Sequence, residues 1–132
     1  MTQIIWNEWE IAGTFIYEIA LSGGMMKLGW RDFESLAHDF SPRVAIKVEE
    51  DAPIKKLLKD AMMKLTQNYD GIKGLIVSLG FRQGEEIQMD DVNDALDCFR
   101  EFNLAYDVNI RWGIEHNGSP EGTRRVIVIA FG

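Results

Sequence analysis

Large apolar and polar residues alternate strictly from residue 106 to residue 114. The apolar side chains occupy the even positions, beginning with Tyr106, and Asp, Asn, Arg and Gly occupy the odd ones. This period of two, with β-branched and aromatic residues, predicts a strand that is buried on one face. The apolar run from Val126 to Phe131 predicts a second strand, buried on both faces. Because turn-forming residues fill positions 115–122, we expect the two strands to form an antiparallel hairpin at the centre of a sheet.

Apolar residues spaced three and four positions apart predict helices in much of the remaining chain. The segments are 7–21, 32–40, a helix that follows Pro53, and 90–102. In the first helix, the core-facing positions are expected to be Trp9, Ala12, Phe15, Ile16, Ile19 and Ala20. The helix after Pro53 has the clearest stripe, with Asp51 as its expected N-cap. Its apolar positions are Ile54, Leu57, Leu58, Ala61, Met62 and Leu65.

Two further strands are expected at 43–48 and 74–79, each followed by one of these helices. A strand, a helix and a second strand in succession require a crossover, which favours parallel strands. Together with the antiparallel hairpin, this order predicts an α+β fold. We expect residues 1–132 to form one domain, a mixed four-stranded sheet with helices on at least one face.

The net charge restricts the partners that the protein can bind, and the cysteine content indicates its cellular compartment. The chain has 21 acidic and 14 basic residues, a formal charge of −7, which argues against non-specific binding to nucleic acid or to an anionic membrane. Glutamates interrupt the apolar residues near the N-terminus, so neither a signal peptide nor a membrane span is expected there. The single cysteine, Cys98, cannot form an internal disulfide, which suits a reducing cytoplasm.

The sequence offers little sign of catalysis, of a metal or of a cofactor. His38 and His116 are far apart and are not part of a Cys/His pattern, so we expect no zinc site. The acidic residues between Asp90 and Asp97 have the spacing of a solvated helix face. No nucleophile motif is present. We therefore expect no catalytic residue, no metal ligand and no bound cofactor.

Four segments resemble parts of the C-terminal domain of FtsZ, the bacterial relative of tubulin. Arg125–Gly132 is similar to the closing strand of that family, Arg-Val-Thr-Val-(Ile/Val)-Ala-Thr-Gly, and Gly74–Ser78 to its Gly-(Ile/Val)-Leu-Val-Asn. Asn109–Gly113 lies where the family has an apolar strand that ends in Phe-Gly. Tyr17–Asp32 aligns without gaps with the end of the family's central helix and its synergy loop. The resemblance covers about residues 12–132 and implies the family's small domain, without its GTPase domain.

The synergy loop departs from the family pattern. In FtsZ this loop reads Asn-x-Asp-Phe-x-Asp, and its two aspartates promote hydrolysis of the GTP held by the next subunit. Here Lys27 replaces the Asn, Gly29 replaces the first Asp, Trp30 replaces the Phe, and only Asp32 matches. A lone Asp at such a place more often caps a helix than catalyses a reaction. The glycine-rich phosphate loop of the family does not occur in these residues, so no GTPase activity is expected.

The leading hypothesis is a non-catalytic FtsZ-like module that acts through protein–protein contact. It would associate with itself or with an FtsZ-type protein, which would connect it with cell division. The candidate contact loop is formed by Lys27, Trp30, Arg31 and Asp32. A simpler reading is that Trp30 packs onto the core and the two cations are solvated.

The alternative hypothesis is an enzyme or small-molecule-binding protein with a site between subunits. The expected sheet and helices are also similar to those of the small chorismate mutases. Convergence of several arginines on one cleft would favour this alternative. The arginines in question are Arg43, Arg82, Arg111, Arg124 and Arg125.

Overall fold

The computed structural model describes residues 1–116 and 122–132, and it describes residues 24–26 by their backbone alone. The turn expected at Asn117–Gly118 and Ser119–Pro120 lies outside the described residues. Among the described residues, the helices are α1 (Glu8–Thr14), the π-helix η1 (Phe15–Ala20), α2 (Trp30–Asp39), α3 (Ile54–Asn68) and α4 (Met89–Tyr106). The strands are β1 (Thr2–Ile5), β2 (Gly23–Met26), β3 (Pro42–Glu50), β4 (Gly74–Phe81), β5 (Asn109–His116) and β6 (Arg124–Phe131).

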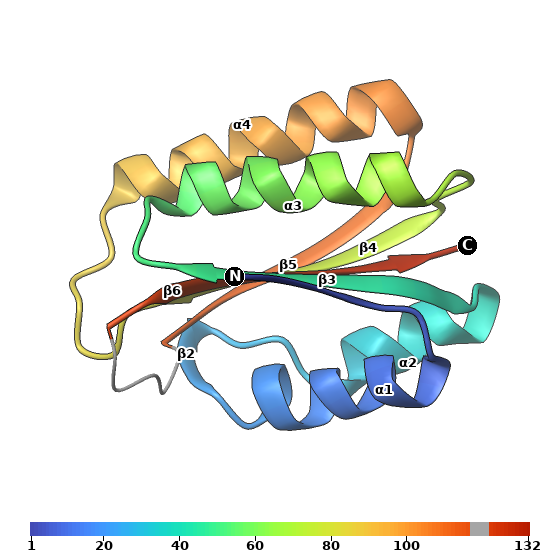
Figure 1. Ribbon diagram of the computed structural model, residues 1–132, viewed down its shortest axis with the longest axis horizontal. Helices are drawn as coiled ribbons and strands as arrows, with labels where there is room; N and C mark the ends of the chain where they lie inside the picture. The colour runs from blue at the N-terminus through green and yellow to red at the C-terminus, as the bar shows by residue number, and fades with distance from the viewer. Residues whose placement is uncertain (117–121) are drawn as a thin grey trace.

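The strands form one mixed sheet between two helical layers (Figure 1). The order across the sheet is β1-β3-β6-β4-β5-β2, and of the described strands only β4 and β5 pair in parallel. Helices α3 and α4 cover one face, and α1, η1 and α2 cover the other. The expected α+β architecture with a mixed sheet is therefore confirmed, and both faces carry helices. In the part of the chain that is described, no helix has both the length and the apolar character needed to cross a membrane.

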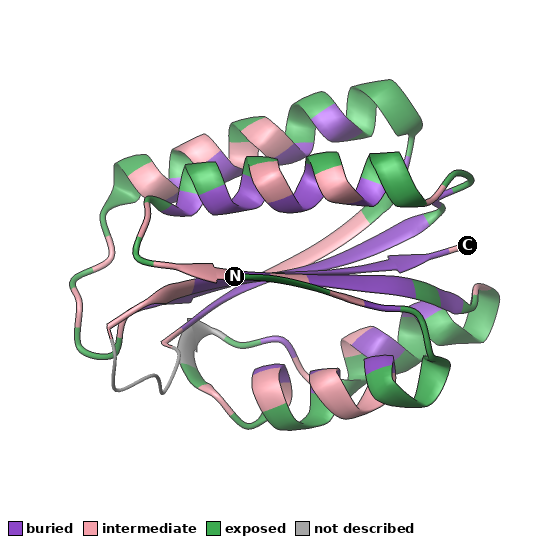
Figure 2. Cartoon of the chain, in the orientation of Figure 1, coloured by how far each residue is buried: buried purple, intermediate pink, exposed green. Residues whose placement is uncertain are grey.

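Strand β6 lies inside the sheet and is buried on both faces, as its apolar run predicts. It pairs antiparallel with β3 on one side and with β4 on the other. Val126, Val128 and Ala130 pack in the core under α3 and α4. Ile127 and Ile129 pack in the second core, under α1, η1 and α2. Figure 2 shows this buried band along the sheet and on the sides of the helices that face it.

The expected hairpin of β5 and β6 is wrong. Strand β4 lies between them, parallel to β5 and antiparallel to β6. The helical connection through α4 places β5 next to β4, so β6 inserts on the opposite side of β4, where β3 provides a second partner. The start of β5 also differs, because Tyr106 ends α4 and Asp107 follows it with a left-handed φ of 52°. The predicted apolar face is nevertheless correct, since Val108, Ile110, Trp112 and Ile114 contact the core under α3 and α4.

The sheet has more strands than the four that the sequence predicts, because a short strand is added at each of its edges. β1 pairs with β3, and β2 pairs with β5, both antiparallel. Each has only four residues, which is too short for an alternating pattern to be recognised in the sequence. All four strands expected from the sequence are present.

The core-facing side predicted for the first helix is confirmed for Phe15 and Ile19, and for Ala12 and Ala20, which pack against the second core, but not for Trp9 and Ile16. Ile11, Phe15 and Ile19 are buried, whereas Trp9 is 86% exposed and Ile16 is 39% exposed. The expected burial of Trp9 is therefore wrong. The reason is that this helix has two apolar stripes, and its second half is a π-helix. The wider π turn keeps residues four apart on one face, so the buried positions follow a spacing of four.

Helix α3 buries every apolar position predicted for it. Its N-cap, however, is Pro53, which provides no side-chain cap, and Asp51 instead forms an ion pair with Arg82. Asp51 is therefore not the N-cap.

Trp112 of β5, which was expected in the core, is only partly buried. Its ring centroid lies 5.9 Å from that of Phe99.

We expect Val128→Asp to unfold the domain. Val128 is fully buried in β6, and a buried carboxylate without a partner costs several kcal/mol, which is comparable to the roughly 5–15 kcal/mol that stabilises a whole domain. Thermal and urea unfolding followed by circular dichroism would measure the effect. Leu104→Asp is the matched control, because Leu104 is 82% exposed on α4. A cooperative transition at the wild-type midpoint for Val128→Asp would contradict the placement of β6.

Candidate functional site

The candidate contact loop lies where β2 leads into α2: Lys27 precedes the helix, whereas Trp30, Arg31 and Asp32 form its first turn. The helix therefore begins two residues earlier than the expected start at Asp32, and Trp30 is not a loop residue. Leu28 is buried and holds the loop to the second core, and Gly29 is the N-cap of α2. Lys27 and Arg31 are exposed, and neither forms an ion pair with another described residue. Two cations are thus presented to solvent on a chain whose formal charge is −7.

Trp30 is both packed and exposed. Its ring stacks on Phe33 at a centroid distance of 4.8 Å and an interplanar angle of 12°, and it lies 5.7 Å from Phe15. Phe33 in turn contacts Phe131 of the central strand. Even so, 37% of Trp30 remains accessible. The aromatic ring is therefore rigidly held by the core and still offers part of its surface.

Asp32 has two partners within the chain. Its Oδ2 accepts a hydrogen bond from the Gly29 N–H at 2.9 Å, and its own N–H donates to the Gly29 carbonyl at 3.0 Å. Arg111 of β5 approaches its Oδ1 to 3.4 Å and also donates to the Ser35 hydroxyl. A carboxylate in the first turn of a helix is stabilised by the helix dipole. The side chain that matches the family's second aspartate thus helps to cap α2, although the N-cap itself is Gly29.

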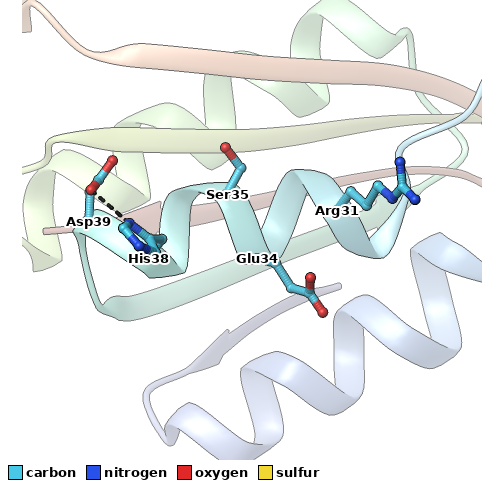
Figure 3. Close-up of a pocket in the computed structure, with 5 residues that line it drawn as sticks. All are labelled: Arg31, Glu34, Ser35, His38 and Asp39. Carbon is cyan, nitrogen blue, oxygen red and sulfur yellow. Dashed lines mark hydrogen bonds and ion pairs between the residues drawn. The ribbon is translucent and has the colours of Figure 1, made fainter.

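The outward side of α2 forms an open depression of about 550 Å³ (Figure 3). All the residues that line it come from this one helix: Arg31, Glu34, Ser35, His38 and Asp39. His38 Nδ1 lies 3.1 Å from Asp39 Oδ1, and both side chains are exposed. No other element contributes a lining residue, so the depression is a solvated helix face. Among the described residues, no group of three or more His, Cys, Asp or Glu side chains could hold a metal ion.

Each of the five arginines of the alternative hypothesis has a partner within the chain. Arg43 donates to the Gly132 carbonyl, Arg82 pairs with Asp51, and Arg111 pairs with Asp32. Arg124 and Arg125 point to different carboxylates, Glu85 and Glu115. The five guanidinium groups are therefore engaged within the chain.

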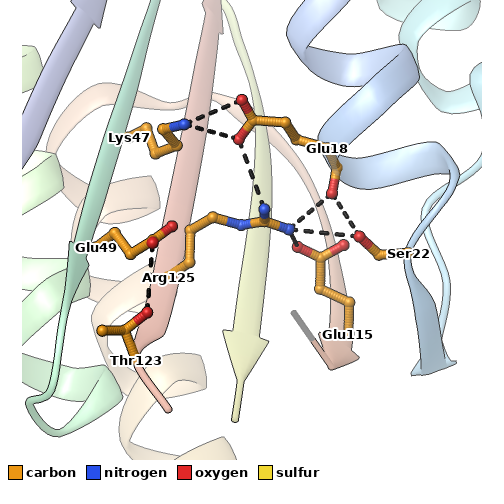
Figure 4. Close-up of polar contacts among 7 residues, drawn as sticks. All are labelled: Glu18, Ser22, Lys47, Glu49, Glu115, Thr123 and Arg125. Atoms are coloured by element: carbon orange, nitrogen blue, oxygen red, sulfur yellow. Dashed lines mark hydrogen bonds and ion pairs between the residues drawn. The ribbon is translucent and has the colours of Figure 1, made fainter. Parts of the chain in front are cut away.

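A buried charge cluster, which the sequence analysis did not identify, lies between the sheet and η1 (Figure 4). Arg125 of β6 donates to Glu115 Oε1 at 2.5 Å and to the Glu18 carbonyl at 2.7 Å. Lys47 of β3 donates to both carboxylate oxygens of Glu18 at 3.0 Å. Two cations and two carboxylates therefore balance within the cluster. Glu115 is only 4% exposed, and its charge depends on Arg125 for compensation.

The cluster attaches the end of η1 to three strands. The Glu18 carbonyl belongs to the last turn of η1, where carbonyls lack partners within the helix, and both Arg125 and the Ser22 hydroxyl donate to it. Gly80 of β4 leaves the necessary room, since a Cβ there would lie 2.9 Å from the Arg125 carbonyl oxygen and 3.4 Å from Glu115. The one visible sign in the sequence is the charged Arg125 directly before an apolar run.

A second ion pair, between Arg124 and Glu85, lies at the same end of the sheet. Arg124 donates to both carboxylate oxygens of Glu85 at 3.0 Å, and the Arg82 N–H donates to that carboxylate at 2.7 Å. Burial raises the pKa of Glu85, but the hydrogen bonds from Arg124 and Arg82 outweigh it, so the pKa is lowered overall.

The thiol of Cys98 is half-buried. Burial raises its pKa, which disfavours the reactive thiolate.

Comparison with known proteins identifies the architecture. An FtsZ dimer from M. jannaschii matches 93% of this chain, with a TM-score of 0.56 and 13% sequence identity. The fold is FtsZ-like. The chain spans 37% of the length of that FtsZ chain. No protein-family model and no curated protein matches the sequence.

Within this FtsZ-like fold, we expect Arg125→Met to destabilise the domain by about 3–5 kcal/mol, because it leaves Glu115 buried without its cation. Urea unfolding at pH 7 measures the loss. Adding Glu115→Gln to Arg125→Met should restore part of the stability, since the uncompensated charge is then removed. Arg100→Met is the control, because Arg100 forms an exposed pair with Asp97. Equal effects of the two Arg→Met changes would show that the cluster does not support the fold.

Proposed function

We propose that the chain corresponds to the C-terminal domain of FtsZ and acts as a non-catalytic module through protein–protein contact. Its partner is a second copy of the chain or an FtsZ-type protein, in the cytoplasm and in connection with cell division. The observation that carries the proposal is an FtsZ-like fold whose synergy-loop positions have lost their catalytic chemistry.

The four segments that resemble FtsZ support the assignment to its C-terminal domain. Three of them are strands β4, β5 and β6, which are consecutive in the sheet in the order β6-β4-β5. The fourth runs from η1 to the start of α2, on the face that covers β6. Segments that resemble one domain of a family therefore lie together in one part of the fold.

The state of the contact loop supports association in place of hydrolysis. Gly29 has no side chain to offer where the family has its first aspartate, and Asp32 is engaged by Gly29 and Arg111. In contrast, Lys27, Arg31 and the accessible part of Trp30 are available to a partner. Two cations beside a partly exposed tryptophan suit an acidic protein surface, with the tryptophan as the residue that contributes most to binding.

We expect the chain to co-sediment with FtsZ from its own cell, assembled with GTP, and the double variant Lys27→Glu, Trp30→Ala to lose this association by roughly tenfold or more in Kd. The matched control is Lys73→Glu with Leu104→Ala, two exposed residues away from the loop. Circular dichroism establishes that each variant is folded. Unchanged association of the loop variant would exclude this loop as the contact surface, and no binding by the wild type would refute FtsZ as the partner.

We also expect the isolated chain to bind no GTP and to have no GTPase activity. The sequence lacks a glycine-rich phosphate loop, and Lys27 and Gly29 stand in place of the synergy-loop Asn and Asp. Isothermal titration calorimetry with GTP and magnesium tests this expectation. A dissociation constant in the micromolar range would overturn it.

A further inference from the structure

Helix α1 and its continuation η1 have a second apolar face, which no described part of the chain covers. We name its four large residues the outer stripe: Trp9, Ile16, Tyr17 and Leu21. Trp9 is 86% exposed, Tyr17 75% and Leu21 69%. Their spacing places them on one side of the helix, opposite the buried Ile11 and Phe15. Figure 2 shows that the side of α1 turned away from the sheet is largely exposed.

None of the positions along the outer stripe holds a charged residue. The positions between its large residues hold Ala12, Gly13 and Ala20, which are small. Glu18, next to Tyr17, turns back to Lys47 and Arg125 in the buried cluster, so the exposed acidic residues beside the outer stripe are Glu8 and Glu10 at its N-terminal end. Single exposed apolar residues are common in soluble proteins, but a contiguous patch of two aromatic and two aliphatic side chains indicates an interaction surface.

We propose that the outer stripe is the interface of a homodimer, in which two copies pack their α1–η1 helices antiparallel about a two-fold axis. This inference specifies the self-association in the proposed function and places it on a different surface from the Lys27–Asp32 loop. The two surfaces are distinct because Trp30 contacts Phe15, which lies on the buried side of the helix.

The order of large and small residues along the outer stripe is self-complementary in this arrangement. A two-fold axis that passes the middle of the helix places Trp9 of one copy against Leu21 of the other, and Tyr17 against Gly13. A Cβ at Gly13 would meet nothing within 4 Å, so the surface at this position is open to an incoming ring. The two-fold symmetry makes each of these contacts occur twice, and in the Tyr17–Gly13 contact a large side chain faces a residue without one.

Charge favours the antiparallel arrangement. Glu8 and Glu10 lie in the first turn of α1, and α1 and η1 together are about 20 Å long. Antiparallel packing puts the glutamates of the two copies at opposite ends, beyond the Debye length of about 8–10 Å, whereas parallel packing would bring them together. A membrane is a poor occupant, because interfacial helices carry Lys and Arg beside their apolar face and this one carries Glu.

The exposed area is sufficient for a reversible dimer. A buried aromatic side chain contributes on the order of 150–250 Å², so the outer stripe would bury roughly 500 Å² on each copy. The total of roughly 1,000 Å² is at the lower limit of specific interfaces, so we expect a dimer that dissociates reversibly.

Sedimentation velocity over a range of concentrations tests the proposal on the whole chain. We expect the wild type to dimerise at micromolar concentrations and Tyr17→Arg to raise the dimer Kd roughly tenfold or more. Leu104→Arg is the matched control, since Leu104 is 82% exposed on α4, and it should dimerise like the wild type. Circular dichroism melts show whether the variants remain folded.

A cross-linking experiment tests the register. In a Cys98→Ser background, a mixture of Gly13→Cys and Tyr17→Cys chains should form mixed disulfide dimers in preference to disulfide dimers of either chain alone, because the antiparallel register places these two positions together. A wild type that stays monomeric at several hundred micromolar overturns the proposal, as does a Tyr17→Arg variant that dimerises normally. If a monomeric chain still binds FtsZ, the dimer inference fails while the proposed function stands. If the chain dimerises but does not bind FtsZ, the dimer inference stands and FtsZ is refuted as the partner.

Discussion

Both faces of strand β6 are covered, and this requires a helical layer on each side of the sheet. Its side chains alternate between two separate cores, one under α3 and α4 and one under α1, η1 and α2. Each core therefore depends on the same backbone, and β3 and β4 satisfy the hydrogen bonds of β6 from both sides. Loss of packing on one face would loosen the strand that supports the other face.

The buried charge cluster shows how this sheet holds an irregular helix. A π-helix is rare and occurs mostly as a single turn within an α-helix. Here Arg125 and Ser22 donate to the Glu18 carbonyl in the last turn of η1, while Lys47 holds the Glu18 carboxylate. The same π turn orients the helix so that Phe15 and Ile19 face the core and Tyr17 faces outward. The cluster and the outer stripe are therefore two results of one local geometry.

Local patterns predicted much of the fold but little of the candidate site. Helix α3 and strand β4 were predicted well because one has a single apolar stripe and the other is apolar throughout. The burial of Trp9 was predicted wrongly because this helix has two apolar stripes. The spacing of the apolar residues predicts a helix but does not indicate which stripe faces the core. The pairing of β5 with β4 depends on a non-local choice that alternation does not encode. Glu18, Lys47 and Glu115 resemble surface residues in the sequence, and only the fold brings them to Arg125.

The position of β6 in the chain also has a consequence for folding. It is the last of the described strands in sequence, yet it lies between β3 and β4, which are formed much earlier in the chain. Because synthesis proceeds from the N-terminus, β3 and β4 each expose an unpaired edge until the ribosome has made β6. The sheet cannot close before then, and the long sequence separation of its central pairings favours slow folding. A nascent chain that stalls before residue 124 would therefore present two open strand edges, a state prone to aggregation and a natural substrate for chaperones.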